Sequence, residues 1–371
     1  MTRSVLPRPT LLPGLPRLWR DRHTLQLGLD PRRAVLLEVA NPAAARLLDL
    51  LDGTRSEREI LDHAATVDVT RDDARALIDA LHSAGLVVAA HTLLPTDLPE
   101  PTRRRLAGEA AALARQGPDN PGTPAQLLRR RAAARVVVTG RGRLAAPVAI
   151  ALAQSGVGHV HPDLAGQVVP TDTVGSGLLA TDLRRPRAVA VAEAIARCAP
   201  GTDTRPVRRG RVDLVVQVGV DRPAGLLAAG YAQRRQPHLL LELRDGTPVI
   251  GPLVPANGSP CLHCVDLHRQ DRDPGWPGLA AQLAAGTAPE PCLVTTLITA
   301  VGYAVSEVLA FLEGGTAETV GGAVEVCGPG RVRRRTWPPH PACGCARRPG
   351  RRAGPGTGGP PPRCLPGTEP A

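Results

Sequence analysis

The sequence contains no lysine, so all 45 of its basic residues are arginine. Schiff-base catalysis, a P-loop lysine and a lysine clamp on a triphosphate are therefore excluded. Aromatic residues make up only 2% of the 371 positions, which leaves few rings on which nucleic-acid bases can stack. The net charge of +11 comes with 39 glycines and 39 prolines, a compositional bias that weakens the usual link between positive charge and nucleic acid. We therefore expect no nucleic-acid partner.

Long apolar runs are also absent. No stretch of about eighteen apolar residues is free of charge and proline, so we expect no membrane span. The first residues, MTRSVLPRPTLLPGLPRLWR, lack the continuous apolar core of a signal peptide. These absences predict a cytoplasmic protein whose cysteines stay reduced.

The eight cysteines include only two close pairs, in SPCLHC and HPACGC. A Zn²⁺ ion prefers four tetrahedral ligands, and each short pair supplies two thiolates from one turn. The candidate ligands of a structural zinc ion are therefore Cys261, Cys264, Cys343 and Cys345. A redox CxxC and a disulfide are the alternatives. A redox pair should open a helix just after a strand, which the proline before the pair and the polar run after it do not suggest.

The chain begins with two different regions. Residues 1–16 are rich in proline and are expected to be disordered. Residues 17–92 show two strands around DPRR, three helices and the closing strand LVVAAHTLL. Two of the helix starts are marked by Ser56 with Glu59, spaced as a capping box, and by Thr70 ahead of RDDARALIDALHSAG. This order predicts a small winged-helix-like α+β module.

A charged connector, residues 93–130, leads to a larger α/β body, residues 131–346. The body opens with the strand RVVVT, the glycine turn GRGRLA and the apolar helix APVAIALAQSG. Further strands alternate with helices, which predicts a doubly wound, Rossmann-like and mostly parallel sheet. GAVEVCG and RVRRRTW predict a hairpin before the second cysteine pair, and the Arg/Pro/Gly-rich residues 347–371 are expected to be a disordered tail.

The glycine turn predicts a nucleotide site. Gly140 and Gly142 let the chain turn tightly at the head of a helix whose amide dipoles favour a phosphate. Asp163 ends the second strand, where it can hold a ribose hydroxyl. The alternative is that the turn serves only to pack the helix on the strand.

These motifs together resemble the ThiF/MoeB superfamily, bacterial relatives of ubiquitin-activating enzymes. The resemblance rests on the glycine turn, Asp163, VDLVVQVGVD, PHLLLELRDGTPVIGPLVPANGSPCLHC and HPACGC, and it covers about residues 130–346. GRGRLAAPVAIALAQSGVGHV and CLHCVDLHRQDRDPGWPGLAAQL are similar to an actinobacterial branch of ThiF-like proteins. The resemblance to the ThiF/MoeB superfamily implies a homodimer that binds ATP, adenylates the C-terminal carboxylate of a small protein and holds zinc between two cysteine knuckles.

Residues 17–92 are in turn similar, in pattern and order, to PqqD-like peptide-recognition modules. Such modules precede ThiF-like domains in the cyclodehydratases that make azoline peptides. This second resemblance implies that the chain recognises a precursor peptide.

The sequence departs from the ThiF-like pattern between Asp163 and Arg187. Active members carry an Asn, an Arg-Gln pair and then a lysine, whereas HPDLAGQVVPTDTVGSGLLATDLRRPR has no Asn and no Arg-Gln pair. Arg185 or Arg187 stands where the lysine is expected, and arginine holds phosphate with a planar fork. Asp221 is the position left for the aspartate that binds Mg²⁺, and helix capping is an equal alternative for it. These departures predict an eroded ATP site.

Two functions follow as expectations. In the first, the chain binds a precursor (leader) peptide as an added strand and docks a partner such as a YcaO-type cyclodehydratase. In the second, it is an active adenylyltransferase of the ubiquitin-like-modifier-activating type, which uses ATP and Mg²⁺ to activate the carboxylate of a peptide or small carrier protein, with Asp221 and Arg187 as catalytic residues. The missing polar residues favour the first. The apolar helix expected over residues 291–312 exceeds what one sheet face needs and predicts a homodimer.

One polar segment is not assigned to any of the motifs above. HRQDRDPGW, residues 268–276, shows no helix or strand period. We expect a salt-bridged surface loop beside the zinc knuckle with Trp276 buried below it, and a partner-docking loop is the alternative.

Overall fold

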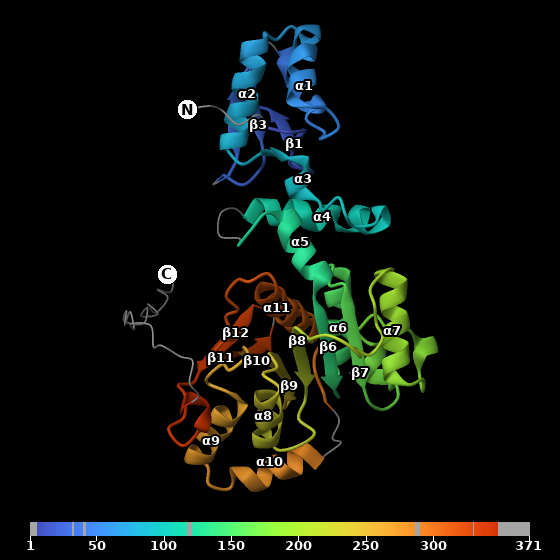
Figure 1. The fold of residues 1–371 in the computed structure, drawn as a ribbon, viewed down its shortest axis with the longest axis vertical. Coiled ribbons are helices and arrows are strands. Elements are labelled where there is room, and N and C mark those ends of the chain that lie inside the picture. The colour runs from blue at the N-terminus through green and yellow to red at the C-terminus, as the bar shows by residue number, and fades with distance from the viewer. Residues whose placement is uncertain are drawn as a thin grey trace, which may run out of the picture.

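The computed structural model describes residues 6–31, 33–39, 42–116, 121–285, 290–328 and 330–347. Three parts follow one another along its longest axis: an N-terminal module, a short helical connector and an α/β domain (Figure 1). Residues 348–371 of the predicted tail lie outside the described residues.

The N-terminal module contains two small antiparallel sheets. In one, β1 (Pro9–Leu11) pairs with β5 (Val87–Ala89). In the other, β2 (Arg17–Trp19), β3 (Thr24–Leu27) and β4 (Val35–Glu38) lie side by side with β3 in the centre. The prediction of disorder is therefore wrong for β1, which is buried because its leucine belongs to the core of the module.

Helices pack on these sheets. They are the 3₁₀ helix Pro42–Leu50, α1 (Glu57–His63) and α2 (Arg71–Ser83). The predicted capping box is confirmed, because Ser56 Oγ accepts the Glu59 N–H while Glu59 accepts the Ser56 N–H. Thr70 Oγ1 likewise accepts the N–H of Asp73 at the start of α2. The sequence marks these helix starts correctly because capping depends only on neighbouring residues.

The connector is helical. It holds α3 (Ala90–Leu93), α4 (Glu100–Gln116) and α5 (Pro124–Ala133). Leu106 of α4 and Leu127 of α5 are buried in a core of their own that also takes in Leu12. This part of the chain is therefore a packed structure between the module and the α/β domain, and not a loose linker.

The α/β domain is built on a seven-stranded sheet in the order β12-β11-β10-β9-β8-β6-β7. Strands β7, β6, β8 and β9 are parallel, and β10, β11 and β12 add antiparallel pairs. Their bounds are β6 (Arg135–Gly140), β7 (His159–Leu164), β8 (Leu214–Val218), β9 (His238–Arg244), β10 (Thr247–Val254), β11 (Gly322–Gly328) and β12 (Arg331–Thr336). The predicted parallel core and C-terminal hairpin are both present.

Helices cover both faces of this sheet, as a doubly wound fold requires (Figure 1). One face carries α6 (Ala145–Gln154), α7 (Arg187–Cys198) and α11 (Val294–Leu312), which form the largest apolar core. The other carries α8 (Ala224–Gln233), whose Tyr231 packs with residues of β8, β9 and α9.

The helix α11 is long and apolar enough to cross a membrane by length and composition alone. Half of its most apolar window is buried inside the molecule, and it packs against α6 and β10. It is therefore placed as the core helix of the α/β domain.

Candidate functional site

The glycine turn connects β6 to α6 as the sequence predicts. Gly140 has φ +103°, and a Cβ there would lie 2.2 Å from the carbonyl oxygen of Val218. Gly142 has φ +126°. Both glycines are therefore required by backbone conformation, and Gly140 is also required by the close approach of β6 and β8.

A cavity of about 1040 Å³ opens beside this turn. It lies at the carboxyl ends of the parallel strands, where open α/β sheets bind ligands. Its wall is partly apolar, with Leu240, Val249, Leu262 and Leu283 among the lining residues. Its charged lining has the six arginines Arg141, Arg143, Arg187, Arg222, Arg244 and Arg269 and the five acidic residues Asp172, Glu242, Asp245, Asp266 and Glu290. The cavity therefore suits a ligand with an apolar part and a charged, hydrogen-bonding part.

Two of the predicted residues, Gly142 and Arg187, line this cavity. Arg187 is engaged already: its Nε and Nη2 donate to Asp172 Oδ2 at 3.2 and 2.9 Å, and its Nη1 donates to the Ala165 carbonyl at 3.0 Å. Asp172 is buried, so this ion pair fixes the loop before α7 as well as the position of the guanidinium.

Four other predicted residues do not line it: Gly140 lies beside it in the glycine turn, and Asp163, Arg185 and Asp221 lie elsewhere. Asp163 is exposed on β7 and accepts a hydrogen bond from Thr139 Oγ1 at 3.0 Å. Arg185, just before α7, donates to Asp182 and to Glu193 of that helix and is therefore held against it. Asp221 faces its neighbour Arg222, and the structure therefore does not bring the predicted ribose, phosphate and Mg²⁺ residues into one site.

Asp221 is ionised and paired. Its two carboxylate oxygens accept from Nε and Nη2 of Arg222, each at 3.0 Å, and this contact holds the pKa of Asp221 below its usual range. Arg222, not Asp221, reaches the cavity wall.

A residue that the sequence did not indicate, Glu290, occupies the glycine turn. Its Oε2 accepts the N–H of Arg143 at 2.9 Å, and the two carboxylate oxygens lie 2.9 and 3.1 Å from where a Cβ on Gly142 would be. Burial raises the pKa of the Glu290 carboxyl, against the lowering effects of the Arg143 N–H and the nearby Arg141 guanidinium. No local pattern around Glu290 in the sequence predicts this contact, which only the fold creates.

The lining of the cavity also includes a cluster of charged and aromatic side chains from β9, α9 and α10. Arg269 lies over the ring of Trp276, 5.0 Å from its centroid, and Trp276 Nε1 donates to Asp266 Oδ1 at 2.6 Å. Burial lowers the pKa of Arg269 to about 10. Glu242 at the end of β9 pairs with Arg244.

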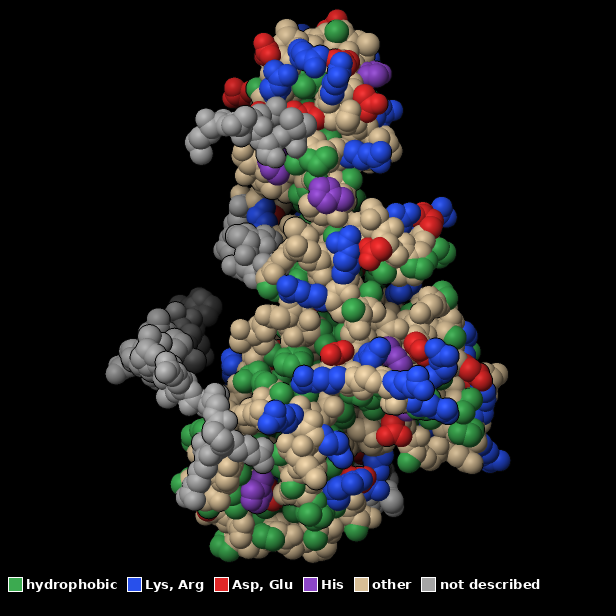
Figure 2. Space-filling model, in the orientation of Figure 1, with side chains coloured by type: hydrophobic (Ala, Val, Ile, Leu, Met, Phe, Trp, Pro, Cys, Tyr) green, Lys and Arg blue, Asp and Glu red, His purple; other side chains and the backbone are tan. Residues whose placement is uncertain are grey.

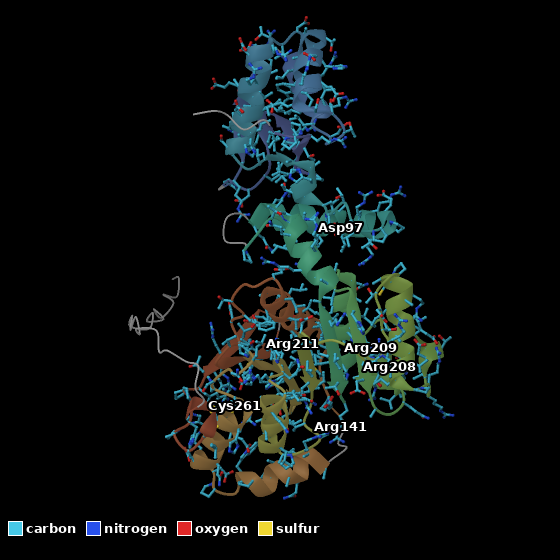
Figure 3. The ribbon with its side chains drawn as sticks, viewed as in Figure 1. Asp97, Arg141, Arg208, Arg209, Arg211 and Cys261 are labelled. Carbon is cyan, nitrogen blue, oxygen red and sulfur yellow. The ribbon has the colours of Figure 1, made fainter. Side chains whose placement is uncertain are left out.

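The four predicted zinc ligands come together at a separate place. The Sγ atoms of Cys261, Cys264, Cys343 and Cys345 all lie within 4.8 Å of one another, and three of these residues are buried. Sulfur–sulfur distances of 3.6 Å (Cys261–Cys343) and 3.9 Å (Cys261–Cys264) are close to the roughly 3.8 Å that four thiolates about 2.3 Å from a tetrahedral zinc would have, whereas Cys264 and Cys345 lie closer together, at 3.2 Å. Figure 3 shows Cys261 well apart from Arg141, so this cluster is distinct from the glycine turn.

The protonation of the cluster is uneven. Burial raises the pKa of Cys264 to about 11, whereas for Cys345 burial is outweighed by hydrogen bonds from Ser259 and the other three thiols, which lower its pKa to about 7. Four closely packed thiols with no disulfide among them are the donor set of a structural zinc site.

The polar run after Cys264 is a helix, not the predicted loop. It forms α9 (Leu262–Arg272), which opens at the first cysteine pair, and α10 (Trp276–Ala285) follows. His340 Nδ1 accepts the Ala342 N–H at 3.1 Å, so its Nε2 carries the proton that it donates to Asp271 Oδ2 at 2.8 Å. This bond ties α9 to the second cysteine pair. Trp276, predicted to be buried, is half-buried.

Surface charge is mixed on the face shown in Figure 2. Arginine side chains are spread over the N-terminal module and the α/β domain with acidic side chains among them, and they do not form one continuous basic face in this view.

Comparison with known proteins places the fold. No family model and no curated protein matches this chain. Among solved structures, E. coli MccB bound to AMPCPP and MccA matches with a TM-score of 0.60 at 13% identity, over 90% of this chain and 98% of that one. The microcin C7 biosynthetic enzyme MccB in complex with N-formylated MccA gives the same values. The heterocyclase TruD matches with a TM-score of 0.56 at 15% identity, over 90% of this chain and 42% of that one.

At these identities the likeness is one of fold. It extends over nearly the whole chain and therefore includes the N-terminal module and the connector as well as the α/β domain. It shows that the α/β domain expected over residues 131–346 shares its fold with these proteins.

Proposed function

We propose that this chain binds a precursor peptide and takes part in its modification. The observation that carries the proposal is a fold shared over 90% of the chain with MccB, solved in complex with the peptide MccA, and with the heterocyclase TruD. The N-terminal module, proposed as a winged-helix-like peptide-recognition element of the PqqD type, is the part that holds the peptide.

The small sheet β2-β3-β4 offers the surface for this role. Within the described residues, no strand pairs with the outer edge of β2 or of β4. Leu18, Trp19 and Leu36 on these edge strands are exposed. An extended peptide can add to such an edge through main-chain hydrogen bonds, and the apolar side chains then provide specificity.

In this proposal, the α/β domain provides the surface that binds a partner enzyme or a second copy of the chain. Leu293, just before α11, and Ile298 on it are 70% and 56% exposed, large fractions for apolar residues of a core helix. Such a face is covered when two copies associate or when a cyclodehydratase of the YcaO type docks. We favour the homodimer, because the same helix face is presented by both copies.

Carboxylate activation with ATP is the second candidate. The cavity, its arginines and the Arg143 N–H fit an anionic ligand, and MccB has been solved with ATP. In this candidate function, the glycine turn, Arg143 and Arg187 hold the phosphates while the peptide carboxylate attacks the α-phosphate of ATP, which forms an acyl adenylate and releases pyrophosphate. Against it, Asp163 and Asp221, the residues expected for ribose and Mg²⁺, do not line the cavity, and Glu290 occupies the turn. We therefore place peptide binding first.

We also propose that the cysteine cluster holds one structural zinc ion. Its four thiols join the start of α9 to the segment after β12. Cys264 and Cys345, one from each of these places, are 81 positions apart in the sequence. A metal there fixes the C-terminal edge of the sheet.

The test uses the full chain and a synthetic copy of the short precursor peptide encoded nearest to its gene. Calorimetry should show micromolar or tighter binding, and Trp19→Ala with Leu36→Ser should weaken it about tenfold or more, because such exposed anchors dominate peptide interfaces. Leu226→Ser, which changes a still more exposed leucine on α8, is the control. Absence of binding, or equal loss in the control, would contradict the proposal.

A further inference from the structure

The carboxylate of Glu290 lies where an anionic ligand of the cavity would bind. The turn residue Gly142 and the Arg143 N–H stand at the start of α6, a helix of ten residues whose N–H groups favour negative charge. The position is therefore filled by an anion that the protein itself provides.

The surrounding arginines hold this segment in place. Arg143 Nη1 donates to the carbonyl oxygens of Glu290 at 3.4 Å and Cys292 at 3.0 Å, while Arg141 Nη2 donates to that of Ala284 at 2.8 Å. Both guanidinium groups line the cavity, and each has one nitrogen bound to these main-chain carbonyls. Arg141 Nη2 and Arg143 Nη1 can turn to a ligand only when they leave these carbonyls.

One polar atom at the turn remains unsatisfied. Arg143 Nε is buried and has no hydrogen-bond partner among the described residues. A buried donor without an acceptor costs free energy, and a ligand with several oxygens can satisfy it where a single carboxylate does not. The turn is therefore better suited to a group with more acceptor oxygens than Glu290 offers.

A second anion cannot share this position. The Glu290 oxygens lie 2.9 and 3.1 Å from the point where a Gly142 Cβ would be, so a phosphate placed against the glycine would overlap them and repel their charge. Asp172, which is paired with Arg187, is a further negative charge close to Glu290.

We propose that Glu290 is an internal competitor that keeps the glycine turn closed to phosphate groups until it is displaced. The inference deepens the nucleotide-binding candidate above and is independent of peptide binding by the N-terminal module. The apparent affinity for phosphate is then the intrinsic affinity multiplied by the fraction of molecules in which Glu290 has left the turn.

The experiment is a calorimetric titration of the full chain with inorganic pyrophosphate, without peptide and at fixed ionic strength. Glu290→Ala should lower the dissociation constant about tenfold or more, and Glu290→Gln, which keeps the shape but not the charge, should give a smaller gain. Asp245→Asn removes another carboxylate of the same cavity and is the matched control, with a change of about threefold or less. A parallel titration with acetate tells a phosphate site from a carboxylate site.

A gain for pyrophosphate in Glu290→Ala, absent in Asp245→Asn, supports the inference, and a gain for acetate alone overturns it. An unchanged or weaker affinity in Glu290→Ala overturns it, and so does an equal gain in Asp245→Asn, which indicates only the general charge of the cavity. Thermal unfolding of each variant confirms that the titrated chain is folded. Failure here leaves the peptide-binding proposal standing, because that proposal is tested at β2 and β4.

Discussion

Arg131 on α5 and Glu313 at the end of α11 form a buried ion pair, with Nε of Arg131 donating to Oε1 of Glu313 at 2.5 Å across 182 positions of sequence. Arg131 also donates to Glu109 at 2.6 Å and to the carbonyl of Ser155 at 3.0 Å. The arginine is 3% exposed. This network joins the connector to the α/β domain.

Replacing Arg131 by Met should lower the free energy of unfolding by about 3–5 kcal/mol, because it leaves the carboxylate of Glu313 buried without a partner. Denaturant titration measures this. The control is Arg129→Met, which removes a surface ion pair with Asp97 and should cost about 1 kcal/mol or less. Adding Glu313→Leu to Arg131→Met should recover much of the loss, and no recovery would contradict the explanation.

His238 should make the fold sensitive to acid. Burial lowers its pKa to about 4, whereas the unfolded chain has the usual 6.5. The unfolded state therefore binds more protons between these values, so stability is full above pH 6.5 and falls as pH drops toward 4, by up to about 3 kcal/mol.

His238→Phe keeps a ring against Tyr231, whose centroid is 4.2 Å from that of the histidine, and removes the titration. The difference in stability between pH 7 and pH 4.5 should shrink in this variant, as measured by denaturant unfolding at each pH. His91→Gln changes an exposed histidine and should leave the difference as it is. If the stability of His238→Phe still falls as much between pH 7 and pH 4.5, groups other than His238 cause the acid sensitivity.

The cysteine cluster should hold about one zinc ion per chain when the protein is purified without chelator. Cys264→Ser should lose the metal by elemental analysis and lower the unfolding temperature, because the knuckles then lose their link. Cys327→Ser, which changes an exposed cysteine outside the cluster, is the control. Metal-free wild-type protein would refute the site.

The exposed face of α11 should bring two copies together. Ile298→Asp places a charge in the centre of that face and should convert a dimer to a monomer by light scattering at high concentration. Leu226→Asp, on an exposed position of α8, should leave the mass unchanged. A wild-type monomer would argue against the homodimer.

Features that depend on nearby residues could be predicted from the sequence. The capping box of Ser56 and Glu59, the turn at Gly140 and the strand pattern of β6 to β9 all arise from local preferences, and the structure agrees with them. The cysteine cluster was predictable for another reason. So few cysteines exist that the two close pairs had only each other as partners.

Features that depend on distant contacts could not be predicted. The strand β1 is short and proline-rich, and it forms only because β5, almost eighty residues later, offers an edge (residues 9–11 with 87–89). Glu290 contacts the turn from 147 positions away. Arg185 is turned toward its acidic partners Asp182 and Glu193. The position of an arginine in the sequence does not show whether it will face such partners or a phosphate.

We propose that this chain, folded with Glu290 in the glycine turn, recognises a peptide and does not activate its carboxylate. The exchange of labelled pyrophosphate into ATP by the wild-type chain, in the presence of Mg²⁺ and its precursor peptide, tests this proposal. We expect exchange no faster than in a reaction without protein, because each absent transition-state donor costs about 10²-fold or more in rate. Peptide-dependent exchange that Asp221→Ala abolishes would contradict it and establish an adenylating enzyme.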